Sequence, residues 1–283
     1  MKEDFEVKNF QDLNLCDDFL FKEVMRDEEL LIGFLEIVLD LKGKIKGIRI
    51  VENEKTIKNR YLEKSIVLDV YAEDEEDSKY DVEIQTGKYS VTPKRSRMYQ
   101  SKMDGKALKP GEDYANLKGQ YIIFVCTGDP FGLGLYQYTF ENRCLEEPSL
   151  KLGDETMKVF LNTKGTKGEV SRELKAFLNF VEKSTVQNAA TINDPYVAKL
   201  SAKIEDIKKD EELGGIYMTL EEKMNELARD KMEEGKKLGL QEGIKEGSLN
   251  RSIEIAKAMK SKGYDIEDII EITQLSKEEI EQL

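Results

Sequence analysis

Residues 68–85, LDVYAEDEEDSKYDVEIQ, decide which fold the sequence predicts. Apolar and polar residues alternate over residues 65–72 and again over residues 80–86, and the letters between them, EDEEDSK, are typical of a turn. This pattern predicts a β-hairpin. Both strands carry acids on one face, and that face is either an ordinary solvated surface or a pair of carboxylates placed to hold a metal ion.

The register of the hairpin brings two of these acids together. Side chains along a strand alternate between its faces, so Asp69 and Glu83 share a face and lie almost directly opposite each other if the turn is centred near residue 76. Directly opposed residues have Cβ atoms about 5 Å apart. Two carboxylates at that distance repel each other unless a cation lies between them. The hairpin alone leaves the solvated face and the metal site open.

The next segment, residues 87–111, is strongly basic in a chain whose net charge is −13. It predicts a helix over residues 93–107 with a single acid, Asp104. A basic helix that carries aromatic residues, beside an acidic pocket, suits phosphodiester cleavage, because cations position phosphates and a metal activates water. The alternative is a solvated helix that balances nearby acids. The basic and aromatic residues of segment 87–111 are Lys88, Tyr89, Lys94, Arg95, Arg97, Tyr99, Lys102, Lys106 and Lys109.

Composition excludes several chemistries. The chain has 283 residues and no His, which rules out a Ser-His-Asp triad and His-ligated zinc. Any metal would have oxygen ligands, as magnesium, manganese and calcium prefer. Three Cys, no apolar run of about 20 residues and no apolar leader in MKEDFEVKNF predict a cytoplasmic protein without a membrane span.

The order of the remaining elements predicts an α/β core followed by helices. Apolar spacing predicts one or two helices over residues 12–41 and strands over residues 45–51, 119–129 and 135–140. After Gly168 the chain is highly charged with apolar residues at helical spacing. We expect three domains, and their ranges are 1–168 for the core, 169–234 for a helical extension and 235–283 for a glycine-repeat helix with a small helical tail.

The tail contains a stripe of glycines at every fourth position, Gly235, Gly239, Gly243 and Gly247. Each interior Gly costs a helix about 1 kcal/mol against Ala. The stripe indicates either close helix–helix approach or a solvated connector. Beyond it, Asp265 and Ser276 are expected to be N-caps, and SKEE at residues 276–279 matches a capping box. The apolar face of this tail needs a partner, which the rest of the chain or a second subunit could supply.

Asp69, followed on the next strand by Glu83-Ile84-Gln85, resembles the core of PD-(D/E)XK nucleases in the variant where Gln replaces the final Lys. More specifically, the chain resembles the recombination-promoting nuclease (Rpn) family, whose members are also described as transposases of the PD-(D/E)XK class. The resemblance covers roughly residues 12–235. It is carried by the hairpin together with KRSRMYQSKMDGKAL (94–108), FVCTGDPFGLGLYQYTFENRC (124–144) and FLNTKG (160–165).

The resemblance implies a restriction-endonuclease-like α/β fold, with a central mixed sheet flanked by helices and an all-helical C-terminal extension. It implies a magnesium-dependent DNA endonuclease, with Mn²⁺ as a substitute. Asp69 and Glu83 would be metal ligands, with the Ile84 backbone carbonyl as a third, and Gln85 would occupy the Lys position as a catalytic residue. Because an amide is neutral and not basic, activation of water would fall to the metal or to a lysine such as Lys88 or Lys64.

The resemblance also implies a nucleic-acid-binding surface and accessory residues. Asp104 and Glu23 are the accessory candidates, with Glu36 as an alternative acid from the first helices. The residues expected to contact nucleic acid are Lys88, Lys94, Arg95, Arg97, Tyr99, Gln100 and Lys102.

Two other readings use the same residues. A ribonuclease would share the site, because recognition of the 2′-OH leaves no readable motif. A catalytically degenerate nucleic-acid-binding or assembly protein would work through the helical tail, with Asp69 and Glu83 turned to open solvent and the glycine stripe in a subunit interface. In each case we expect a homo-oligomer formed through the tail.

Overall fold

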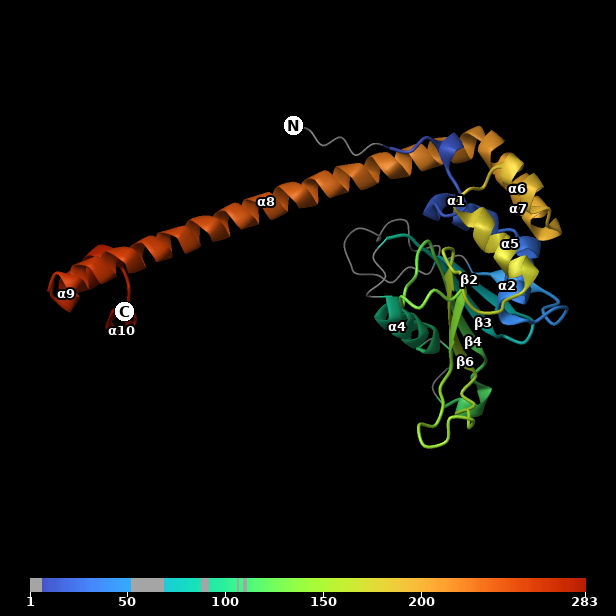
Figure 1. Cartoon of the computed structure of the whole chain (residues 1–283), viewed down its shortest axis with the longest axis horizontal. Coiled ribbons are helices and arrows are strands. Elements are labelled where there is room, and N and C mark those ends of the chain that lie inside the picture. The colour runs from blue at the N-terminus through green and yellow to red at the C-terminus, as the bar shows by residue number, and fades with distance from the viewer. Residues whose placement is uncertain (1–6, 52–68, 88–91, 106, 109–110) are drawn as a thin grey trace. The chain divides into compact units, whose positions relative to one another are not determined.

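The computed structural model describes residues 7–51, 69–87, 92–105, 107–108 and 111–283 (Figure 1). The predictions for Lys64, Lys88, Tyr89, Lys106, Lys109 and residues 65–68 therefore lie outside the described residues. The described chain divides into two compact units, Lys8–Tyr217 and Met218–Leu283. The three-domain division expected from the sequence stays a prediction.

The first unit is built on a six-stranded mixed sheet with the order β1-β2-β3-β4-β6-β5. β3, β4 and β6 are parallel, while β1, β2 and β5 pair antiparallel with their neighbours. This confirms the predicted mixed α/β fold. The strands are β1 (Ile48–Ile50), β2 (Val70–Asp74), β3 (Lys79–Gln85), β4 (Gln120–Cys126), β5 (Gln137–Phe140) and β6 (Thr156–Asn162).

The sequence pattern missed one central strand, β6. Only Val159, Phe160 and Leu161 form an apolar run there, and the flanking Lys158 and Asn162 hide the strand. Asn162 is fully buried, and it helps to form the turn after β6. Its side-chain amide donates to the Leu135 carbonyl at 3.0 Å, and its side-chain oxygen accepts from the Lys164 N–H at 2.9 Å.

Helices cover both faces of the sheet in the first unit (Figure 1). α1 and α2 pack on one face, with α5 and α7 packed against these helices, and α4 packs on the other face. The paired helices predicted for residues 12–41 and the basic helix are confirmed, whereas α6 was not predicted. The bounds are α1 (Asp18–Met25), α2 (Glu28–Leu39), α4 (Thr92–Asp104), α5 (Arg172–Val181), α6 (Val186–Ile192) and α7 (Pro195–Lys209), with short 3-10 helices at Phe10–Asp12 and Tyr114–Asn116.

Side-chain caps set where several of these helices begin. Asp27 accepts from the Leu30 N–H at 3.3 Å at the start of α2, and Ser171 accepts from the Leu174 N–H at 3.1 Å at the start of α5. Asp194 caps α7, where Pro195 occupies the first turn with its φ already restricted to helical values. These local signals are all present in the sequence.

Both faces of β3 are buried, because β3 lies between β2 and β4 and helices cover the sheet on both sides. Val82 and Ile84 face the main core with α1 and α2, and the opposite face carries Asp81 and Glu83 toward α4. Tyr99 and Met103 of α4 close this second face over an aromatic layer that includes Phe124, Phe160 and Tyr138. Asp81 and Glu83 therefore lie inside the protein, not on a solvated face of the sheet.

The long helix α8 (Glu211–Ser261) runs for 51 residues. The helix continues through the glycine stripe. Nothing in the described chain lies within 4 Å of a Cβ built at any of the four glycines of the stripe. The close approach suggested by the stripe thus has no counterpart within the described parts of this chain. At the first unit's end of α8, Tyr217 packs on Phe10 and Phe19, with ring centroids 5.7 and 5.3 Å apart.

The C-terminal unit ends in two short helices, α9 (Ile266–Thr273) and α10 (Lys277–Gln282). Ser276 and Glu279 form the predicted capping box. Asp265 precedes α9 as predicted but makes no side-chain capping bond. A small apolar core joins these helices to the end of α8, and its buried members are Ala256, Ile269, Leu275 and Ile280.

Two further expectations concern the whole chain. In the part of the chain that the structure describes, no helix is long and apolar enough to cross a membrane. Cys16, Cys126 and Cys144 carry free thiols, and Cys126 is buried in β4.

Gly165, at the end of the FLNTKG stretch, allows the turn after β6 to pack against the start of β5. A Cβ at this position would lie 2.5 Å from Tyr136 Cα and 2.8 Å from its backbone nitrogen. Gly165→Ala should therefore lower the free energy of unfolding by about 1–3 kcal/mol or more, since backbone atoms cannot move aside cheaply. Gly215→Ala, in open space on α8, is the matched control and should leave stability unchanged or raise it. Denaturant melts of both variants measure this, and equal stabilities would contradict it.

Candidate active site

The hairpin register places Asp69 opposite Glu83, as the sequence predicted. Val70 pairs with Val82 and Tyr71 with Asp81, so the next position before β2 lies across from Glu83. The Asp69 backbone N–H donates to Glu83 Oε1 at 2.9 Å. The two residues lie where β2 begins and β3 ends, at the edge of the sheet where the parallel strands have their carboxyl ends. Ligands commonly bind at this edge in open α/β sheets.

Three carboxylates gather here, from Asp69, Asp81 and Glu83, and we call them the acid cluster. The Glu83 side chain is 1% exposed, Asp81 is fully buried, and Asp69 is 13% exposed. Burial raises the pKa of all three, and the repulsion of Asp69 raises the pKa of Asp81 and Glu83 further. Within the part of the chain that the structure describes, both carboxylate oxygens of Asp81 are buried without a hydrogen-bond partner. The cluster thus holds acceptor oxygens that its hydrogen bonds do not satisfy.

Two cations reach the acid cluster from different helices. Lys22 of α1 lies 2.9 Å from Asp69 Oδ1 and also 2.7 Å from Asp18. Arg95 of α4 contacts Glu83 Oε2 at 3.1 Å. Their charges lower the pKa of the acids they face and so oppose the effect of burial.

Gln85 and Tyr99 hold the Arg95 guanidinium in place. One nitrogen of Arg95 donates to Gln85 Oε1, and the other donates to the Tyr99 hydroxyl at 2.6 Å as well as to Glu83. The Tyr99 hydroxyl in turn donates to Glu83 Oε2 at 3.2 Å. The guanidinium carbon lies 5.4 Å from the Tyr99 ring centroid and 5.8 Å from that of Phe124.

The structure separates the remaining basic residues of α4 by their exposure. Lys94 and Arg97 are exposed, so they lie on the outer side of the helix, whereas Arg95 turns inward to the acid cluster. Lys102 is half-buried, and its charge lowers the pKa of Asp81. Arg95 and Arg97 therefore face different surroundings, and their contacts with phosphate stay predictions.

The other predicted residues have partners outside the acid cluster. Gln100 accepts a hydrogen bond from Lys158, and Asp104 accepts one from Gln120 Nε2 at 2.5 Å. Glu23 pairs with Arg26, so Lys22 is the residue by which α1 reaches the cluster. Glu36 accepts from the Gly43 N–H at 2.6 Å. The Ile84 side chain faces the main core, and the role of its carbonyl stays a prediction.

Sequence reasoning missed three members of the site, namely Lys22, Asp18 and Asp81. Asp81 is not among the residues that the sequence assigned to the site, although its spacing of two residues from Glu83, which puts both side chains on one face of the strand, was the available signal. Lys22 and Asp18 are four residues apart on α1, and nothing in the local sequence indicates that this part of the helix packs beside Asp69. Only the packing of α1 on the sheet reveals their contact.

The acid cluster fits a divalent metal in charge and in donor type. Its ligands would be carboxylate oxygens, which Mg²⁺ and Mn²⁺ prefer, and the unpartnered oxygens of Asp81 indicate unsatisfied negative charge. The three carboxylates do not converge on one point in this arrangement, because among the described residues no group of three or more Cys, Asp or Glu side chains is placed to hold a metal ion. Lys22 and Arg95 are the counter-ions of Asp69 and Glu83 in this arrangement.

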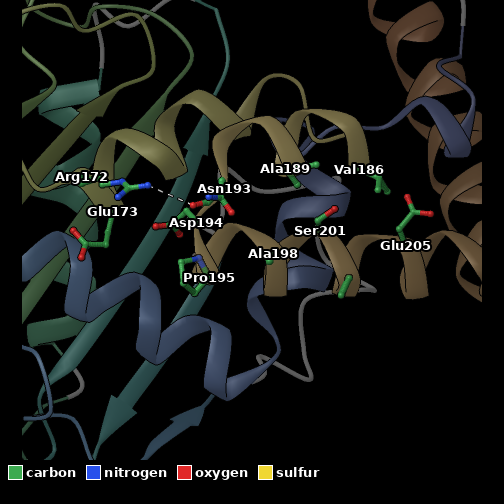
Figure 2. Close-up of a pocket in the computed structure, with 12 residues that line it drawn as sticks. Arg172, Glu173, Val186, Ala189, Asn193, Asp194, Pro195, Ala198, Ser201 and Glu205 are labelled. Atoms are coloured by element: carbon green, nitrogen blue, oxygen red, sulfur yellow. Dashed lines mark hydrogen bonds between the residues drawn. The ribbon is translucent and has the colours of Figure 1, made fainter.

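A separate open pocket of about 870 Å³ lies among α5, α6 and α7 (Figure 2). Arg172 donates across its rim to the Asn193 carbonyl at 3.5 Å, while Ala189 and Ala198 form part of its apolar floor. The lining contains no residue of the acid cluster and has no buried polar atom left unsatisfied among the described residues. It therefore provides no chemistry comparable with that of the cluster.

A mixed sheet covered on both faces by helices, with the spacing Asp69-x13-Glu83-x-Gln85 at the carboxyl end of a parallel strand, defines the PD-(D/E)XK class of nucleases. The chain matches the model of the PD-(D/E)XK nuclease family transposases over residues 15–233, and it belongs to that family. Searches of curated proteins and of solved structures found no match.

A second family model, the C-terminal helix-turn-helix (HTH) domain of the Rpn/YhgA-like nuclease family, matches residues 249–283. This range covers the end of α8 together with α9 and α10. The HTH was not recognised from the sequence, which indicated only short capped helices with an apolar face. The two matches together bear out the resemblance to the Rpn family.

Removing the charge of Asp81 should stabilise the protein when no metal is present. A buried, unpartnered acid costs about 1–3 kcal/mol or more, so Asp81→Asn should raise the free energy of unfolding in EDTA at pH 8 by about that amount. Because the pKa of Asp81 is raised in the folded state, wild type should lose stability relative to the variant as the pH rises above about 4, and the difference between the two should vanish below it.

Asp74→Asn provides the control for this effect. Asp74 accepts from the Glu76 and Ser78 N–H groups at 2.9 Å, so removing its charge relieves no unpartnered acid. Urea melts at pH 4 and pH 8 measure both variants. An Asp81→Asn protein less stable than wild type at pH 8 would show that the Asp81 carboxylate is satisfied in solution.

Proposed function

We propose that the chain is a metal-dependent endonuclease that hydrolyses phosphodiester bonds of DNA at the acid cluster. The observation that carries the proposal is the burial of Asp69 and Glu83 against each other at the carboxyl end of β3, in a member of a nuclease family. The reading of a degenerate assembly protein expected both acids in open solvent, and their burial favours the nuclease instead. A ribonuclease using the same cluster is the second possible outcome of the experiment below.

Asp69 and Glu83, with the Ile84 carbonyl, would hold Mg²⁺, with Mn²⁺ as a substitute. A divalent ion bound there supplies a Lewis acid and an activated water for attack on phosphorus. The Glu83 carboxylate is oriented for this role by the Asp69 N–H, the Tyr99 hydroxyl and Arg95. The burial of the cluster excludes bulk water and strengthens each electrostatic contact inside it.

The DNA-binding surface would lie on the outer side of α4, where Lys94 and Arg97 are exposed. The HTH match is a second indication of DNA as the partner. Its last helix, however, carries Glu278, Glu279 and Glu281 against Lys277 and would repel phosphates. Residues 262–283 contain seven acids and two lysines in all. We therefore assign most of the phosphate affinity to α4.

The tail remains the proposed contact between subunits. The glycine stripe of α8 is exposed in this chain, and a second copy packed along it would use the close approach that glycines permit. This self-association, like a magnesium preference over manganese and a cytoplasmic location, stays a prediction.

Asp69→Ala and Glu83→Ala should each abolish cleavage of supercoiled plasmid, because each removes a proposed metal ligand. Wild-type protein should nick the plasmid with Mg²⁺ or Mn²⁺ and not with EDTA. Circular dichroism should show that both variants keep the fold. Wild-type-like cleavage by either variant would contradict the site assignment, and cleavage of single-stranded RNA but not of plasmid would replace DNA with RNA as the substrate.

Arg97→Ala should weaken DNA binding about equally for all sequences and should lower the magnitude of the slope of log K against log salt by about 1, because one phosphate contact is lost. Lys277→Ala is the matched comparison on α10 and should change both quantities less, since the surrounding acids already oppose DNA there. Fluorescence anisotropy in EDTA at several salt concentrations measures both. A larger loss for Lys277→Ala would place the main DNA contact on the HTH.

A further inference from the structure

The proposed nuclease site lacks a positive charge at one position. Gln85 occupies the place of the lysine in the D/E-x-K pattern, and an amide cannot stabilise developing negative charge as an ammonium does. Charge at that point matters because hydrolysis places extra negative charge on the phosphoryl oxygens and the leaving oxygen in the transition state. A cation from elsewhere in the chain is therefore to be looked for near Gln85.

Arg95 is the cation that contacts Gln85 directly. The guanidinium donates to the side-chain oxygen of Gln85 with one nitrogen and to Glu83 and Tyr99 with the other. These contacts use the fork geometry of the group, which a lysine could not reproduce. The side chain remains 38% exposed, so donors of the same group are accessible from the solvent side of the cluster.

The charge of Arg95 lies directly at the acid cluster. Its guanidinium contacts Glu83 Oε2 at 3.1 Å, and the other oxygen of the same carboxylate accepts from the Asp69 N–H at 2.9 Å. Lys22 is the other candidate, but it lies between Asp69 and Asp18, and these two carboxylates already balance its single charge. In the described chain, the ion pairs of Lys22 are with Asp18 and Asp69 and not with Gln85.

We propose that Arg95, held in place by Gln85, supplies the positive charge that a lysine supplies in the D/E-x-K pattern, and that it contacts the phosphate under attack. This inference rests on the proposed nuclease function. In the reaction, the water oxygen forms a bond to phosphorus, the bond from phosphorus to the leaving oxygen breaks, and the proton lost by the water ends on the leaving oxygen. Arg95 stays protonated throughout and stabilises charge only. Gln85 is a positioning residue that acts through Arg95.

A charge-relocation cycle on the full-length protein tests this assignment. The four proteins are wild type, Arg95→Gln, Gln85→Lys and the double variant Gln85→Lys/Arg95→Gln. Arg95→Gln should lower kcat about 10²–10³-fold with a small change in KM, as expected for loss of one transition-state donor. Gln85→Lys alone should also lower kcat, because Arg95 loses its acceptor and meets a second cation. The double variant should recover at least tenfold over Arg95→Gln, since the charge is restored at the motif position.

Binding of Mn²⁺ without DNA, measured by calorimetry, separates this proposal from the nuclease function itself. Arg95→Gln should bind Mn²⁺ as tightly as wild type or more tightly, because a competing cation is removed while the carboxylates stay. Asp69→Asn should lose Mn²⁺ binding. Arg143→Gln, whose arginine also contacts one carboxylate and is 44% exposed, is the control and should match wild type in kcat and in Mn²⁺ affinity.

Several outcomes would overturn the inference. A double variant no more active than Arg95→Gln, with unchanged Mn²⁺ affinity, would reject Arg95 as the substitute charge while leaving the nuclease in place. Arg95→Gln that loses Mn²⁺ affinity as Asp69→Asn does would show that Arg95 only arranges the carboxylates. If Arg95→Gln failed to fold, Arg95→Lys would replace it, with an intermediate loss of kcat expected. A wild type that cleaves neither DNA nor RNA, with Mn²⁺ affinity unaffected by Asp69→Asn, would reject the nuclease function and the inference together.

Discussion

The burial of three carboxyl groups in the β2–β3 hairpin, under α4, is the constraint on which the rest of the core depends. Asp69, Asp81 and Glu83 repel one another in a low dielectric, and burial alone would favour their neutral forms. The fold offsets part of this cost by bringing a cation to two of the three acids, Lys22 to Asp69 and Arg95 to Glu83. A sheet that exposed this face to water would need neither cation.

The layered architecture explains why the two cations come from different helices. β3 is covered on one face by α1 and its neighbours and on the other by α4. Each layer contributes apolar side chains to its own face of the sheet and one basic side chain to the shared end of the strand. Asp81 lies deeper under α4, where Tyr99 and Met103 close the face, and it obtains no hydrogen bond there. The buried carboxyl of Asp81 therefore lowers the stability of the core.

Local patterns in the sequence predicted what depends on neighbours along the chain. The hairpin register, the buried strand β4 and the capping box at Ser276 follow from alternation, an apolar run and a four-residue motif, and the structure confirms them. β6 escaped because its apolar run is short and its polar residues, Lys158 and Asn162, find hydrogen-bond partners in Gln100 and the Leu135 carbonyl, which lie far away along the chain. The contacts of Lys22 join residues 47 positions apart and depend on how α1 packs, which no local pattern encodes. The HTH was hidden because capped short helices are common to many small domains.

Two helices of the chain, α4 and α10, carry charge of opposite sign. The chain has an excess of 13 negative charges, yet α4 carries four basic residues and one acid directly above the acid cluster. The last helix of the HTH shows the reverse, with three glutamates and one lysine. By charge alone, α4 would attract a phosphate backbone and the last helix would repel it.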